Sequence, residues 1–376
     1  MNNRIKYLDG IRIISSVVVC IAHSIQIFLI PKLGSTNILS LISGQAASYA
    51  VVVFFMLSGF MVTNSIFNNN SKNNYFSFSK YWKDRLLRLY PPLIFSIGLS
   101  LFIYLFIKFF HLHGSVSFKL PEDLGLARDA IQYSFGEMVN SLFFIQGFKN
   151  ISMLMNGPLW SLGDEFFLYL IASLVSIMVF NRKVILPALL IIFLFIYVYQ
   201  SGHLKTAIYL YVMWGIGAFF SIEKNKPIDY FTNRINFIFC ITFFLLLFGI
   251  LLLLKFRIPP INYEFSKSTL IQASVLLFFV FLFRSLSISL KNEIIKLFEK
   301  ITPAKDFTYT LYVIHFPILL FYFSLTHVWL NSMYTYSSYI VLLVIIPTII
   351  YIANRLAKYL ENKKYVENVC KFLLSH

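Results

Sequence analysis

Ten long apolar stretches, separated by shorter polar ones, dominate the chain. Each runs for about 20 residues, the length at which a helix crosses the hydrocarbon core of a bilayer. The pattern predicts spans at about 11–30, 45–66, 89–110, 157–180, 184–201, 205–222, 236–254, 268–288, 307–330 and 336–357. We therefore expect an all-α, polytopic membrane helix bundle. A further apolar segment at 139–150 is too short to span, and we expect it to re-enter the membrane or to lie at its surface.

The basic residues are distributed unevenly between the polar segments. With the N-terminus in the cytoplasm, the segments on that side hold 22 of the 32 Lys and Arg residues; nine lie on the other side, and Arg12 lies inside a span. Basic residues concentrate on the cytoplasmic side of membrane proteins. The distribution predicts that both termini are cytoplasmic. It also explains the net charge of +16 by topology and contact with anionic lipid, without a nucleic-acid partner.

Composition agrees with one integral-membrane domain. Charged residues make up 13% of the chain, about half of the share of roughly 25% in soluble domains. Cys20, Cys240 and Cys370 are scattered and form no disulfide or metal-ligand pattern. We expect a single domain over 1–376, with no cleaved signal peptide, no attached soluble domain and no metal. The longest polar segment, 111–156, is expected outside the cytoplasm as a lid or an acceptor-binding surface.

Arg12 and His23 are ionisable residues within the first predicted span. Eleven residues separate them, close to three full helical turns at about 100° per residue, so both point from one face. They lie roughly 16 Å apart along the axis. Ionisable side chains are costly in lipid and usually mark a working site. The pattern places a cation near one membrane surface and an imidazole near the midplane, as a general base or, alternatively, as a histidine that only packs helices.

Arg85 and Arg88 come just before the third predicted span and share one helix face. Two guanidinium groups at the cytoplasmic surface suit a phosphate or pyrophosphate clamp. Ordinary anchoring of the span by positive charge is the alternative. Pro91 and Pro92 follow, and we expect them to begin or end a helix sharply. The aromatic and basic stretch 75–83 suits a separate interfacial helix.

Asp164 and Glu165 lie roughly two turns inside the fourth predicted span, near the outer leaflet. Adjacent helical positions face about 100° apart, so the two are not expected to serve one site together. At least one should face a cavity, because a carboxylate facing lipid is expensive.

Two further segments carry small or polar residues inside predicted spans. His315, early in the ninth span, fits either a second polar residue of the site or a helix–helix hydrogen bond. Ser58 and Gly59 form a small pair in the second span, which is typical of closely packed helices. A nucleophilic serine at this position would need a base beside it.

Five segments, taken in order, resemble the acyltransferase 3 family of integral-membrane acyltransferases. They are Tyr7–Arg12 continuing to His23, Phe54–Phe60, Arg85–Pro92, Pro158–Glu165 with Tyr169, and Tyr309–Tyr312 with His315 and Pro317. Each is a weak signal alone, but together they occur in the family's order over nearly the whole chain. The resemblance associates Arg12, His23, Arg85, Arg88 and Glu165 with activity.

The chain departs from the family's pattern directly after Glu165. Family members usually carry a second carboxylate or polar residue there, whereas Phe166 follows here and Asp164 precedes. The resemblance therefore implies no role that needs a second polar group at that position.

The resemblance implies a transfer reaction at the membrane. An acyl group, most often acetyl, would pass from cytoplasmic acyl-CoA to a hydroxyl of an extracytoplasmic or lipid-linked cell-surface glycan. Arg12, Arg85 and Arg88 would bind the donor, and His23 and Glu165 would be catalytic. The residues expected to bind substrate are Asp164, Trp160, His315 and Tyr312.

The expected partners are acyl-CoA, a glycan acceptor and membrane lipids, and the expected location is the bacterial cytoplasmic (inner) membrane. Succinyl or other acyl transfer to a periplasmic glucan, and acetyl transfer to an amino group, are alternatives within the enzyme class. A glycan or solute transporter would explain the spans and the intramembrane charges equally well. It would not need an imidazole three turns from Arg12 or the arginine pair. A non-catalytic scaffold for polysaccharide assembly is a third possibility.

Overall fold

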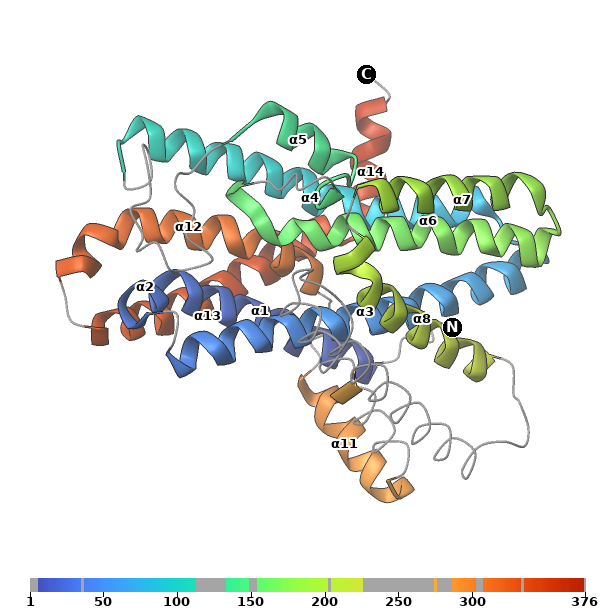
Figure 1. Cartoon of the computed structure of the whole chain (residues 1–376), viewed down its shortest axis with the longest axis horizontal. Helices are drawn as coiled ribbons and strands as arrows, with labels where there is room; N and C mark the ends of the chain where they lie inside the picture. Colours follow the sequence, from blue (N-terminus) through green and yellow to red (C-terminus); the bar gives the residue numbers. More distant parts are fainter. Residues whose placement is uncertain are drawn as a thin grey trace, which may run out of the picture.

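The structure is a computed structural model of the 376-residue chain. It describes residues 6–34, 37–112, 133–148, 154–201, 204–225, 274–275, 286–301, 307–332 and 335–374. All elements in these ranges are helices, as Figure 1 shows. The predicted span 236–254, most of 268–288 and the centre of the polar segment 111–156 lie outside the described residues.

The helices follow one another along the chain with short connections. They are α1 (Lys6–Phe28), α2 (Ile30–Leu33), α3 (Ile38–Asn73), α4 (Phe78–Phe109), α5 (Phe135–Leu142), the 3₁₀ helix η2 (Leu154–Leu159), α6 (Trp160–Asn181), α7 (Ile185–Gln200), α8 (Leu204–Asn225), α11 (Ile288–Ile301), α12 (Thr308–Ser332), α13 (Thr335–Leu360) and α14 (Lys363–Leu374).

Six of the described helices are long and apolar enough to cross a membrane. They run over Tyr7–Phe28, Ile38–Asn73, Phe78–Phe109, Met155–Asn181, Thr308–Thr326 and Ser338–Leu360. Shorter apolar helices at Ile185–Val198 and Tyr209–Ile222 coincide with the fifth and sixth predicted spans. The prediction of an all-α membrane helix bundle is therefore confirmed, while the total of ten spans and the cytoplasmic placement of both ends stay predictions.

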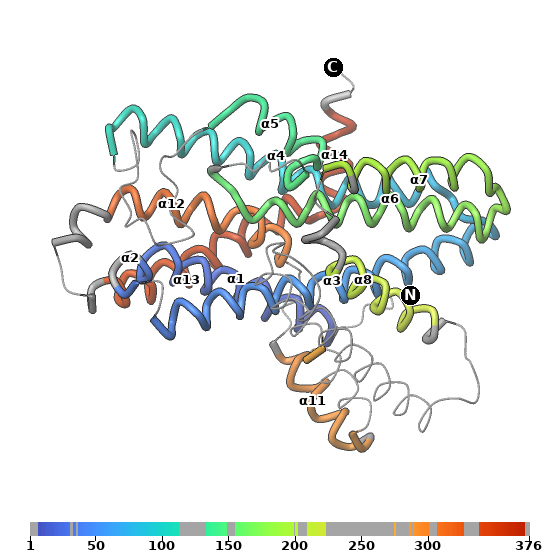
Figure 2. The backbone as a smooth tube through the Cα atoms, viewed as in Figure 1, coloured from blue at the N-terminus to red at the C-terminus, as the bar shows by residue number. Residues whose placement is uncertain are grey.

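Helix α12 forms the centre of the bundle. It packs against α1, α4, α13 and η2, and 83% of its most apolar window is buried. Figure 2 shows α3 running along much of the molecule, past α1 and on to α8, both of which it contacts. The residues that follow therefore lie on helices that meet around α12.

Helices α3 and α8 approach each other through two glycines. A Cβ atom added at Gly59 would lie 1.9 Å from the backbone oxygen of Trp214, and one at Gly217 would lie 1.9 Å from that of Met56. Small residues let helix backbones meet closely in membranes. The close packing expected at Ser58 and Gly59 is confirmed.

A proline in α12 creates the contact that joins three elements. Pro317 has no N–H, so the carbonyl of Val313, four residues earlier, loses its helical donor. The hydroxyl of Ser96 from α4 donates to that carbonyl, and Asn156 Nδ2 from η2 donates to it at 2.7 Å. Asn156 Nδ2 also lies 3.0 Å from Ser96 Oγ. Because these groups are buried, their hydrogen bonds fix η2, and with it the start of α6, against α4 and α12.

The chain between α5 and α6 enters the bundle instead of following its surface. Phe144, Gln146 and Phe148 are buried, and Gln146 Nε2 donates to the Leu159 carbonyl at 3.1 Å. The described part of the short apolar segment 139–150 thus fits the re-entrant alternative. As a consequence, α6 begins in the interior.

The expectation that Pro91 and Pro92 begin or end a helix was wrong. Both lie inside α4, which is continuous, and most of the stretch 75–83 forms its first turns and no separate interfacial helix. A proline inside a helix costs about 3 kcal/mol. Burial of the neighbouring apolar side chains Leu89 and Leu93 outweighs a cost of this size in a packed bundle.

Candidate active site

A pocket with three arginines lies where the N-terminal parts of α1, α4 and α12 meet. Its polar lining includes Arg12, Arg85, Arg88 and Glu165, and we call it the arginine pocket. The pocket has about 740 Å³ of empty space counted out to its open mouth, a size typical of ligand sites. Three guanidinium groups against one carboxylate favour an anionic ligand.

Two aromatic rings hold the guanidinium of Arg85. Its Cζ atom lies 5.0 Å from the ring centre of Tyr169 and 5.4 Å from that of Tyr81. Arg85 is only 7% exposed, and a desolvated cation over an aromatic face is stabilised by the ring's charge distribution. Contacts on the faces of the guanidinium leave its N–H groups to bind in its own plane, which suits a phosphate.

Asp9 accompanies Arg12 one turn earlier on α1. Arg12 Nη1 lies 3.7 Å from Asp9 Oδ1, and the two side chains are 12% and 4% exposed. At this distance the ion pair is loose. The carboxylate therefore steadies Arg12 at the pocket wall without neutralising the pocket's positive charge.

Glu165 belongs to the arginine pocket, and the expectation that it lies near the opposite surface was wrong. Its Oε1 atom accepts hydrogen bonds from Ser58 Oγ at 2.9 Å and from the hydroxyl of Tyr169. The reason for the difference is that α6 starts inside the bundle at η2. Glu165, early in α6, therefore reaches the arginines.

A second pocket contains His23. We call it the histidine pocket, and its lining consists of Val19, His23, Ala47, Ser48, Val51, Val52, Pro158, Trp160, Leu210 and Tyr312. Val51 and Tyr312 also line the arginine pocket, so the two pockets adjoin at these two side chains.

Helix α3 lines both pockets along one continuous stretch. It runs from Ala47 in the histidine pocket to Val62 in the arginine pocket, which is about 22 Å at the helical rise per residue. On α1, Arg12 lines the first pocket and His23 the second, so the shared face expected from their spacing leads to two connected sites.

The ring of His23 is held by neighbours on α1 and α12. Its Nδ1 atom lies 2.7 Å from Gln26 Oε1. The ring stacks on His315, with centroids 5.4 Å apart and planes 22° apart, and meets the edge of Phe316 at 5.4 Å. These contacts fix the plane of the imidazole beside the histidine pocket.

His315 is fully buried and lines neither pocket. Its Nδ1 atom lies 2.8 Å from the carbonyl oxygen of Tyr312 and 3.1 Å from that of Leu311. An Nδ1–H that donates to these oxygens leaves the lone pair on Nε2, which has no hydrogen-bond partner among the described residues. The structure thus places His315 behind His23, and its expected contact with substrate stays a prediction.

Asp164 and Glu165 have different neighbours, as their adjacent positions on a helix predict. Asp164 is fully buried and accepts a hydrogen bond from the hydroxyl of Tyr211 on α8 at 2.7 Å. It lines neither pocket, which confirms that the two carboxylates do not share one site. The assignment of Asp164 as a substrate-binding residue stays a prediction.

The other expected substrate residues lie at or near the junction of the pockets. Trp160 lines the histidine pocket and Tyr312 lines both. The hydroxyl of Tyr312 donates to the carbonyl of Pro158 at 2.8 Å and lies 2.6 Å from Ser161 Oγ. Tyr312 is therefore held in place at the point where the pockets meet.

Phe166 has a structural place away from both pockets. It stacks on Phe144, with ring centroids 4.4 Å apart, and lies 5.1 Å from the ring of Trp82. The position at which the family usually has a polar residue is thus part of an aromatic cluster in this chain.

Sequence reasoning assigned no role to three residues that hold the site together. Tyr81 lies four residues before Arg85, Tyr169 four after Glu165, and Gln26 three after His23. Residues at these spacings meet on a helix surface, so the spacing could have identified them once the helices were placed. Within the described part of the chain, no group of three or more His, Cys, Asp and Glu side chains is arranged to hold a metal ion.

Comparison with known proteins gives one match. A family model described as an acyltransferase domain matches residues 5–352. No significant match was found among curated proteins, and none among solved structures. The match covers nearly the whole chain, and the prediction of a single domain over residues 1–376 is compatible with it but stays a prediction.

Proposed function

Because the chain belongs to the acyltransferase 3 family, we propose that it transfers an acyl group, acetyl in the first instance, from acyl-CoA to a hydroxyl of a cell-surface glycan. The observation that supports this most is the junction of the two pockets. A cationic site for the donor adjoins, at Val51 and Tyr312, a site that contains an imidazole. We place the protein in the bacterial cytoplasmic membrane, with the arginine pocket toward the cytoplasm.

The arginine pocket is the proposed donor site. The phosphate groups of CoA are multiply charged, and arginine binds phosphate oxygens through paired N–H groups. Arg12, Arg85 and Arg88 would hold these groups near the mouth. The pantetheine arm would then extend along α3, past Val51, and bring the thioester to His23.

The histidine pocket is the proposed site of reaction. His23 removes the proton from the acceptor hydroxyl as its oxygen attacks the thioester carbonyl carbon. The carbon–sulfur bond then breaks, and the imidazolium returns the proton to the CoA thiolate. The products are the acyl ester of the acceptor and CoA with a free thiol. The flat face of Trp160 and the hydroxyl of Ser48 offer an aromatic surface and a hydrogen bond to a sugar.

Glu165 acts on the donor side in this scheme. It accepts a hydrogen bond from Tyr169, whose ring in turn lies against Arg85. We propose that Glu165 orients the groups that hold the phosphates. This differs from the contact with the acceptor that its expected position near the outer leaflet suggested.

The test is acyl transfer by the purified protein in lipid vesicles with labelled acetyl-CoA and a glycan acceptor. His23→Ala should lower kcat by about 10²- to 10⁴-fold, the usual contribution of a general base, with donor affinity retained. Arg85→Ala should weaken donor binding by about 10- to 100-fold, the loss of a charge-assisted hydrogen bond. The matched control is Lys80→Ala, an exposed cation of the same helix that lines neither pocket.

Absence of CoA binding and of thioester turnover in a folded, inserted wild-type protein, with acetyl and succinyl donors alike, would exclude the proposal. The transporter would then be the better explanation. Turnover with an amino acceptor but with no hydroxyl acceptor would keep the enzyme and correct the substrate class.

A further inference from the structure

The contact between His23 and Gln26 carries information about where the proton of the imidazole lies. Gln26 Oε1 is 2.7 Å from His23 Nδ1, one turn further along α1. A carbonyl oxygen of an amide accepts hydrogen bonds and cannot donate them. The nitrogen that faces it must therefore carry a hydrogen, which places the lone pair of neutral His23 on Nε2.

We infer that Gln26 is a positioning residue that selects this tautomer of His23 for acyl transfer. The inference rests on the proposed function, in which His23 takes a proton from the acceptor. A neutral imidazole can hold its hydrogen on either ring nitrogen, and only the nitrogen without it can act as a base. Gln26 lines neither pocket, so it reaches the reaction through His23.

The orientation of the ring is set separately, from α12. His315 stacks on one face of His23, and Phe316 meets it edge-on. His315 is itself fixed by the carbonyls of Leu311 and Tyr312, so it forms a rigid surface. The two helices thus have separate roles, because α12 fixes the plane of the imidazole while Gln26 on α1 decides which nitrogen is protonated.

This arrangement resembles, in chemical logic, the carboxylate that orients the histidine of hydrolytic triads. An amide differs from a carboxylate because it has no charge to stabilise the imidazolium. It therefore contributes orientation and tautomer selection alone. An uncharged partner also avoids placing a second carboxylate inside a membrane span, where ionised groups are costly.

The experiment compares three variants in the vesicle assay. Gln26→Met keeps the length and removes the acceptor, and should lower kcat by about 10- to 100-fold with the KM for acyl-CoA within about twofold. Gln26→Glu keeps an acceptor toward Nδ1 and should retain activity within about fivefold of wild type. Gln45→Met, at an exposed glutamine of α3 outside both pockets, is the control for loss of an amide and should match wild type.

A second measurement reports the tautomer without requiring turnover. In protein with ¹⁵N-labelled histidine, the signals lost in His23→Ala assign the ring of His23. Wild-type protein should show protonated Nδ1 and unprotonated Nε2, and Gln26→Met should show a mixture of both tautomers. This readout keeps the inference testable if the protein transfers no acyl group, because the proposed function would then fail while the tautomer is still observed.

Three results would overturn the inference. One is full activity of Gln26→Met, and another is a Gln26→Glu variant as inactive as Gln26→Met, since the amide would then be needed for its N–H. The third is a wild-type His23 that carries its proton on Nε2. Loss of donor binding in Gln26→Met would equally count against it, because a residue that acts through His23 should not alter the arginine pocket.

Discussion

At the scale of single residues, the site is built from side chains that are held by a neighbour three or four positions away. Tyr169 serves two partners: its hydroxyl donates to Glu165, and its ring lies 5.0 Å from the Arg85 guanidinium. The hydrogen bond and the ring contact can be separated by substitution. This makes Tyr169 the best position at which to measure how the donor site is organised.

Tyr169→Phe keeps the ring against Arg85 and removes the hydroxyl, whereas Tyr169→Leu removes both. A desolvated cation–π contact contributes about 1–2 kcal/mol. We therefore expect Tyr169→Leu to weaken acetyl-CoA binding by about 5- to 30-fold relative to Tyr169→Phe, as measured by calorimetry in detergent. Equal affinities of the two variants would show that the ring does not support Arg85.

At the scale of elements, the contact of α3 with α8 depends on two glycines. Gly59→Ala and Gly217→Ala each place a Cβ atom 1.9 Å from a backbone oxygen, so the helices must separate. Overpacking of this kind destabilises by about 1–3 kcal/mol or more. We expect a lower midpoint of thermal unfolding for either variant.

The control for the glycine prediction is Gly98→Ala in α4. An added Cβ at Gly98 meets no atom within 4 Å, and alanine is favoured over glycine inside a helix by about 0.5–1 kcal/mol. Gly98→Ala should leave the midpoint unchanged or raise it. A Gly59→Ala protein as stable as Gly98→Ala would contradict the close packing of α3 on α8.

The link between α12 and η2 gives a second prediction at this scale. Asn156→Ala removes one of the two donors to the Val313 carbonyl that Pro317 leaves without a helical partner. We expect a loss of about 1–3 kcal/mol, the penalty for a buried group with a missing partner. In a Pro317→Ala background the restored N–H should make the same substitution less costly, and equal losses in both backgrounds would refute this explanation.

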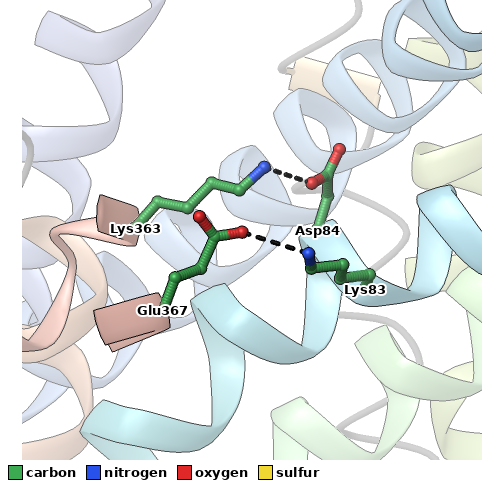
Figure 3. A network of polar contacts seen from close by, with 4 residues as sticks. All are labelled: Lys83, Asp84, Lys363 and Glu367. Atoms are coloured by element: carbon green, nitrogen blue, oxygen red, sulfur yellow. Dashed lines mark hydrogen bonds and ion pairs between the residues drawn. The ribbon is translucent and has the colours of Figure 1, made fainter. Parts of the chain in front are cut away.

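At the scale of the whole molecule, the C-terminal helix α14 is attached to the beginning of α4. Figure 3 shows two ion pairs between them, Lys363 with Asp84 at 2.5 Å and Lys83 with Glu367 at 3.4 Å. All four side chains are at least 31% exposed, so each pair stabilises by about 1 kcal/mol or less and weakens with salt. The pairs come directly before Arg85 in α4.

Removal of both pairs should loosen α14 and leave the bundle intact. We expect Lys363→Ala combined with Glu367→Ala to increase hydrogen exchange of α14 at low salt, with little change in α12. Lys364→Ala, on the same helix but outside both pairs, is the matched control. Unchanged exchange in the double variant would show that the apolar contact of α14, which includes buried Val366, is sufficient.

The fold was largely predictable because each span is long, and apolar length is a strong signal. The depth of Glu165 was not predictable, because it depends on the re-entry of the chain before α6. That re-entry depends on contacts of Asn156 with Ser96 and Val313, which are 60 and 157 positions away. Pattern within one segment cannot show such contacts.

The same distinction holds for the site. The shared face of Arg12 and His23 follows from helical spacing alone. The stacking of His315 on His23 required two helices far apart in sequence to be placed together. Short-range contacts such as Gln26 with His23 lay within reach of the sequence, but only once the base had been identified.

The most direct test of a reaction between the two pockets addresses their junction. Val51→Trp should block the passage between them, and Val51→Ala should keep it open. Acetyl-CoA affinity and acyl transfer are measured on the same vesicle preparations. We predict that Val51→Trp binds acetyl-CoA within about threefold of Val51→Ala and loses at least about 100-fold in transfer, the scale of a lost general base. Transfer by Val51→Trp at the rate of Val51→Ala would contradict a reaction that joins the two pockets.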